Sequence, residues 1–325
     1  MYSDRFKGYF FALLATISYS CVYIFSKAAM NEIGQAQQVS ATGTHLSGSF
    51  DVLLQFLFYQ FLFAFTLNAI WSATTGKFRL FKNLNGSQIR IFLLLGLMEI
   101  LTNTSFYLSI FVISNPSVTS FLGNLYPVIL TLMGVAFLKE RFNRIEILGV
   151  ILALIGAFFV SLRKMEFSPT FSHLFIPGTL IVLVNAILAS TTSIIGKINV
   201  RKLTPELITL NATLWPLISA TVLMIVFRES WTIPAHALAN IAAGSFLGPF
   251  MGVLLIYYSF KFIEVSRSSI VQSLKGIIVL IGTVIYFGTL PETHQIIFGL
   301  LSVVGVVIMT LAQAGFLKPG RAFRK

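Results

Sequence analysis

Long apolar runs that recur along the whole chain constrain its fold more than any other feature. Runs of around 20 residues, enough for a helix to cross about 30 Å of hydrocarbon, follow one another from Gly8 to Leu317. Charged residues are 10% of the 325-residue chain and its mean hydropathy is +0.86, whereas about a quarter of the residues in soluble domains are charged. We therefore predict an all-α integral membrane protein.

The hydrophobic pattern predicts ten transmembrane helices, which places both termini on one side. If the termini are inside, 18 of the 23 Lys and Arg residues fall on the inner side and 3 in outer loops. Because inner loops carry the positive excess, we expect cytoplasmic termini and a multi-pass protein of a cell inner (plasma) membrane. The net charge of +12 follows from this bias and does not indicate a nucleic-acid partner. The predicted spans are 8–28, 50–73, 91–112, 117–138, 145–162, 174–196, 206–227, 237–260, 267–288 and 295–317.

The chain also carries a weak internal repeat. A shift of 170 residues places Lys27 on Lys197, and a shift of 150 residues places Tyr107 on Tyr257. The shifts agree with the spacing of the loops, which indicates a five-plus-five duplication. Since five is odd, the two halves must cross the membrane in opposite senses. This inverted-topology repeat is the plan of many secondary transporters, whose site lies near the midplane at the repeat interface.

Several motifs in this order resemble the EamA-type members of the drug/metabolite transporter superfamily. The motifs are the run Tyr19–Lys27, Asn124-Leu-Tyr-Pro127, Phe137–Asn143, Gly149 and Gly156-Ala157, with Leu290–Thr293, Gly299 and Gly305-Val306 in the second half. The resemblance implies a ten-helix carrier with EamA-like five-helix repeats at 1–165 and 166–325. It also implies a central cavity lined mainly by spans 1, 3, 4, 6, 8 and 9, and export of amino-acid-like metabolites.

Two features depart from the family pattern. The segment Asn31–Ser49 is longer than the usual first loop, and Lys275 stands in the ninth span where the pattern is apolar or small. An ammonium near the bilayer centre costs roughly 2.5–3.5 kcal/mol, so it should face the bundle interior or a watery cavity. Glu99 in the third span lies at about the same depth, roughly 12–14 Å from the cytoplasmic edge. Equal depth allows a direct contact between the two groups.

This pair has a functional and a structural interpretation. The groups can bind a charged or zwitterionic solute, or Glu99 can carry a coupling proton; alternatively they form an ion pair that locks two helices. Asn103 and Tyr107 share a helical face with Glu99, and Gln272 shares one with Lys275. Small polar side chains also act as hydrogen bonds between membrane helices, which leaves individual positions open.

Other spans carry further candidates with simpler alternatives. Asn124 and Tyr126 lie beside Pro127 in the fourth span, which predicts a kink next to the cavity or an ordinary packing irregularity. The glycines at 244, 248 and 252 are spaced for close helix packing. Lys27 and Lys197, at the ends of spans 1 and 6, are interpreted as snorkelling anchors. The candidate substrate-binding residues are Glu99, Asn103, Tyr107, Asn124, Tyr126, Tyr257, Gln272 and Lys275.

The sequence therefore predicts a secondary transporter, and an exporter by resemblance, of a small polar or zwitterionic metabolite. It would work by alternating access, either proton-coupled or facilitative, without a cofactor, as a monomer or homodimer in contact with lipid. The spans hold no catalytic constellation, metal motif or phosphate-binding loop, so we expect no enzyme. Two alternatives stay open, namely a membrane enzyme or lipid-handling protein using the same cavity, and an interaction partner docking through Asn31–Ser49.

Overall fold

The computed structural model describes residues 2–40, 48–77, 84–138, 144–162, 176, 178–263, 268 and 271–313, and helix dominates these ranges. Each span predicted from the sequence overlaps helix within these ranges, with turns at 123–124 and 273–274 inside the fourth and ninth spans. Seven of the described helical segments are long and apolar enough to cross a membrane, and Lys275–Phe287 and Thr293–Met309 are shorter apolar helices. The prediction of a multi-pass helical membrane protein is confirmed at this level.

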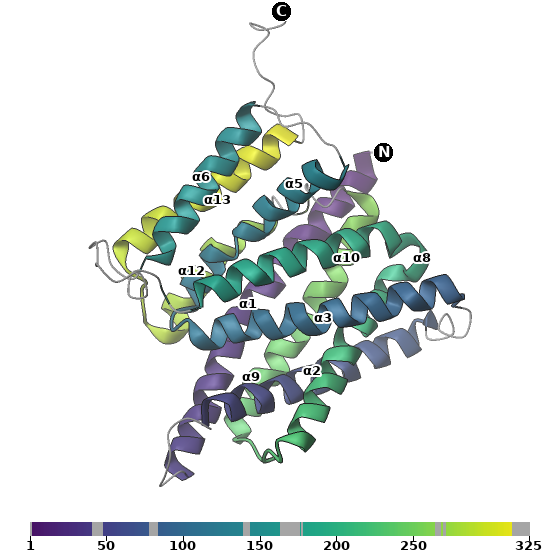
Figure 1. Ribbon diagram of the computed structural model, residues 1–325, viewed down its shortest axis with the longest axis vertical. Helices are drawn as coiled ribbons and strands as arrows, with labels where there is room; N and C mark the ends of the chain where they lie inside the picture. The colour runs from purple at the N-terminus through teal and green to yellow at the C-terminus, as the bar shows by residue number, and fades with distance from the viewer. Residues whose placement is uncertain are drawn as a thin grey trace, which may run out of the picture.

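The described residues of the first half include six helices, most of which are labelled in Figure 1. Their starts follow ordinary capping chemistry. Asn85 caps α3 through reciprocal hydrogen bonds with Gln88, and Asn115 caps α4, which has a proline in its first turn. The helices are α1 (Tyr2–Ser40), α2 (Gly48–Thr74), α3 (Gly86–Val112), α4 (Pro116–Leu122), α5 (Leu125–Leu138) and α6 (Arg144–Ser161).

The second half contains a long bent helix and an irregular one. The sixth and seventh predicted spans run together as α8, which is interrupted at Thr204, where φ is 61° and ψ is 150°. Pro205 follows directly, and a residue before proline avoids the helical conformation. The eighth span contains a π-helical segment, η2, around Pro249. The elements are α8 (Thr179–Val226), α9 (Ala235–Ser245), η2 (Phe246–Gly252), α10 (Val253–Phe262), α12 (Lys275–Phe287) and α13 (Thr293–Gln313).

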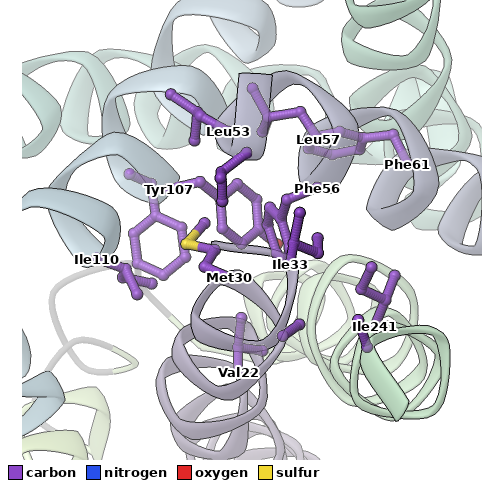
Figure 2. Packing of buried hydrophobic residues seen from close by; sticks show 14 of the residues in the cluster. Val22, Met30, Ile33, Leu53, Phe56, Leu57, Phe61, Tyr107, Ile110 and Ile241 are labelled. Atoms are coloured by element: carbon purple, nitrogen blue, oxygen red, sulfur yellow. The ribbon is translucent and has the colours of Figure 1, made fainter. Parts of the chain in front are cut away.

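The first loop is shorter than predicted, because α1 continues through most of Asn31–Ser49. Ile33 is 1% exposed and belongs to a hydrophobic cluster with Met30, Phe56 of α2 and Tyr107 of α3 (Figure 2). Burial of this apolar face stabilises the extra turns, since packing rather than propensity supplies most helix stability. Parts of three predicted features lie outside the described ranges. They are residues 41–47 of the outer loop, 139–143 of the Phe137–Asn143 motif, and 264–267 at the start of the ninth span.

Glycines bring the helices of the two halves into close contact. A Cβ atom at Gly248 would lie 2.3 Å from Cγ2 of Val22 in α1, and one at Gly252 would lie 3.0 Å from Tyr19. The packing interpretation is therefore confirmed for these two glycines, whereas a Cβ at Gly244 would lie 3.4 Å from its nearest neighbour, Phe25. α6 and α13 lie side by side (Figure 1) and cross where a Cβ at Gly149 would come within 2.7 Å of the Gly305 carbonyl oxygen.

Two lysines at matching positions of the halves cap neighbouring helices. The Lys27 ammonium donates hydrogen bonds of 3.0 Å each to the carbonyl oxygens of Ile110, Phe111 and Ile113, at the end of α3. Lys197 donates to the carbonyl oxygens of Phe260 and Ile263, at the end of α10. A cation there satisfies orphan carbonyls and matches the negative end of the helix dipole.

The interpretation of these lysines as snorkelling anchors is wrong for Lys27. Its side chain is only 8% exposed, and its three ammonium donors all point at protein carbonyls. The snorkelling interpretation assumed that a lysine at a span end reaches water. In the structure the Lys27 side chain instead points toward the end of α3. The sequence alone did not show that this helix end lies next to Lys27.

Candidate functional site

A central cavity lies between helices of both halves. Its walls come from α1, α3, α5, the first part of α8, the η2–α10 segment and the start of α12. These elements correspond to spans 1, 3, 4, 6, 8 and 9, with Ala212 added from the seventh. The chain enters this region through interrupted helices. Turns at Gly123–Asn124 and Ser273–Leu274 precede α5 and α12, so both helices begin beside the cavity.

One charged group of the cavity, Glu99, is held by its own helix. Its side chain is 8% exposed, and the Nδ2 group of Asn103 donates to carboxylate Oε2 and to the Glu99 carbonyl oxygen, both at 2.9 Å. Asn103 lies one turn further along α3, so both face the cavity. The amide fixes the orientation of the carboxyl group without neutralising it by a cation.

The other charged group, Lys275, lies between aromatic rings. Its Nζ is 5.5 Å from the ring centroid of Tyr19 and 5.9 Å from that of Tyr126. These distances are within the range of cation–π attraction. Within the described part of the chain, no ion pair joins Lys275 to Glu99, although both line the cavity. A lock between two helices therefore does not describe the contacts of this pair here.

A polar wall between α3 and α8 completes the cavity. Asn185 donates from Nδ2 to the carbonyl oxygen of Thr102 at 2.7 Å and to Oγ of Ser105 at 3.0 Å. The Thr102 hydroxyl lies 3.2 Å from that of Thr192. Next to Thr192 on α8, Oγ of Ser193 accepts a hydrogen bond of 2.9 Å from the Tyr126 hydroxyl. These bonds tie the polar faces of helices from both halves together around the cavity.

Six of the eight predicted site residues line this cavity. They are Glu99, Asn103, Tyr126, Tyr257, Gln272 and Lys275. The cavity lining does not include Tyr107, which lies in the hydrophobic cluster of Figure 2, where its hydroxyl accepts from Nε2 of Gln60 at 3.1 Å. Asn124 is 2% exposed and sits behind the wall, close to Gly276 of α12. The substrate contacts of all eight stay predictions.

Sequence reasoning missed several lining residues. Tyr19 and Tyr23 of α1 were noted only as part of a motif, and Asn185, Thr192 and Ser193 of α8 were not selected. A signal was present, because an amide and two hydroxyls at this spacing share one helical face of an apolar span. The face could not be assigned to the cavity until the partner helix was known.

Comparisons with known proteins agree with this architecture. Residues 6–162 and 176–311 each match the sequence model of the EamA-like transporter family. One solved structure, titled only "Crystal structure of protein", is similar with a TM-score of 0.58 and 16% sequence identity, and the match covers 92% of this chain and 100% of that one. At this identity the likeness shows the fold alone. None of the curated proteins compared with the chain matches it.

Proposed function

Because the chain belongs to the EamA-like transporter family, we propose that it is a secondary transporter of a small zwitterionic metabolite. One observation carries the proposal: a carboxyl group and an ammonium group share one interior cavity without pairing with each other. Ionisable groups at such depth mark substrate or ion pathways. Lys275 binds the anionic group of the solute, and Glu99 carries a coupling proton.

Transport follows from exposing this cavity alternately to the two sides of the membrane. We infer ten crossings in two inverted five-helix repeats at 1–165 and 166–325, with both termini in the cytoplasm of an inner-membrane protein and export as the direction. The matched caps of Lys27 and Lys197 support the repeat. So does the equal position, 150 residues apart, of the turns at Gly123–Asn124 and Ser273–Leu274. Each half would then rock about the cavity as one body.

Solute exchange in liposomes that contain only this protein tests the function. Liposomes loaded with unlabelled amino acids should accumulate the labelled form of a transported solute, and protein-free liposomes should not. Glu99→Gln should remove the pH dependence of transport while leaving exchange of bound solute measurable. Glu99→Gln combined with Lys275→Gln should give folded, inactive protein. Normal transport by the double variant would contradict the role of both residues, and unchanged pH dependence in Glu99→Gln would contradict the proton role.

A further inference from the structure

The aromatic environment of Lys275 has the composition of a cation-binding cage. Tyr19 approaches the ammonium from α1 and Tyr126 from α5, so two rings from separate helices face one cation. Rings arranged in this way recognise substituted ammonium groups in ligands. Here the cation comes from the protein's own chain, on a flexible four-carbon stem that can move away.

The rings are held in place independently of the lysine. The Tyr126 hydroxyl is anchored to Ser193 at 2.9 Å. The Tyr19 ring packs against Phe106 with centroids 5.6 Å apart, and its Cδ2 would lie 3.0 Å from a Cβ at Gly252. A cage fixed by neighbouring contacts needs little rearrangement to accept another cation of similar size, which lowers the cost of binding.

We propose that Lys275 is a tethered stand-in for the substrate's ammonium group, which takes its place between Tyr19 and Tyr126 when substrate binds. The displaced Lys275 ammonium then pairs with the anionic group of the same solute. The inference rests on the proposed function, because it assigns the two ends of the zwitterion to named groups. It defines the ligand class as solutes that carry an alkylammonium group next to an anionic group.

The proposal predicts a gain of binding when the stand-in is removed. With Lys275→Gln, the cage is open to a free cation, and tetramethylammonium should bind at least about tenfold more tightly than to the unchanged protein. This change corresponds to about 1.4 kcal/mol, in the range of a desolvated cation–π contact. Binding is measured on detergent-purified protein by titration calorimetry with tetramethylammonium chloride, against equal concentrations of sodium chloride.

The location of the gain is tested with ring variants in the Lys275→Gln background. Tyr19→Phe keeps the aromatic face and should retain the tighter binding, whereas Tyr19→Leu with Tyr126→Leu should abolish it. Lys261 provides a matched control, since its Nζ lies 5.1 Å from the ring centroid of Tyr258 on a separate part of α10. Lys261→Gln should leave tetramethylammonium affinity unchanged.

Three outcomes would overturn the inference. The first is that Lys275→Gln and Lys275→Met both melt cooperatively, which shows that they are folded, and bind tetramethylammonium no more tightly than the unchanged protein. The gain could persist in the double leucine variant, or Lys261→Gln could produce an equal gain. If the protein still exchanges solute in liposomes when one of these results is found, the cation-cage proposal is wrong and the transporter function is retained. If Lys275→Gln binds tetramethylammonium more tightly but the protein exchanges no solute, the cation cage is supported and the transporter function is contradicted.

Discussion

Removing the ammonium of Lys27 should destabilise the protein more than removing any partly exposed lysine of the bundle. Lys27→Met keeps a similar side-chain length and apolar stem but leaves three carbonyl oxygens at the end of α3 without their donor. Hydrogen bonds to charged groups contribute about 1.5–3 kcal/mol each, and a buried unsatisfied group costs about 1–3 kcal/mol. Against this, methionine no longer requires desolvation of a charge.

We therefore expect a net loss of about 2–4 kcal/mol in the free energy of unfolding. The variant no longer buries an ammonium group on folding, and this gain offsets part of the loss of three hydrogen bonds. At about 2 °C per kcal/mol for a chain of this size, the melting temperature should fall by about 4–8 °C. The assay is thermal unfolding in detergent followed by tryptophan fluorescence. Lys261→Met is the matched control, because its ammonium lies over the Tyr258 ring and interacts with the Glu206 carboxylate, and no hydrogen bond to a helix-end carbonyl is described for it.

A Lys27→Met protein that melts within about 1–2 °C of the unchanged protein would refute this reasoning. Such a difference corresponds to a loss of about 1 kcal/mol or less in unfolding free energy. That result would mean that water or helix fraying satisfies the α3 carbonyls without the lysine. A fall of equal size in Lys261→Met would show instead that the loss reflects general removal of charge. Either result would contradict the helix-cap role assigned to Lys27.

Two further predictions follow from the packing and from the surface electrostatics. Gly149→Ala should lower stability by about 1–3 kcal/mol in detergent melting, since its Cβ would lie 2.4 Å from the backbone nitrogen of Met309. Gly34→Ala, with its Cβ 3.8 Å from the nearest neighbour, should instead stabilise by up to about 1 kcal/mol, and equal effects would contradict the close contact. Partial burial and the carboxyl group of Asp51 raise the pKa of Glu229 to about 7. The folded state then binds the proton more tightly than the unfolded state, so this site loses stability as the pH rises from about 4.5 to 7; Glu229→Gln should flatten this part of a melting-temperature profile.

The membrane class and the position of the helices were predictable from local sequence. An apolar run of sufficient length must form helix in hydrocarbon because every backbone polar group needs an internal partner. The same logic located Lys275 and Glu99 as interior groups, since neither tolerates lipid. Local rules failed at the first loop, because Ile33 is stabilised by packing against α2 rather than by the composition around it.

For the candidate site too, the sequence predicted some features and tertiary packing decided the others. Residue type and helical spacing alone identified Glu99, Asn103, Gln272 and Lys275 as polar groups that must face inward, and the sequence therefore determined which chemistry the interior contains. Whether two such groups touch depends on the rotation and separation of their helices, and Glu99 and Lys275 are 275 − 99 = 176 residues apart in the chain. Tertiary packing decided that each has its own neighbours: an amide for Glu99 and two aromatic rings for the lysine. Contacts between distant helices arise from their packed surfaces, and no local pattern in one helix encodes the partner that it will meet.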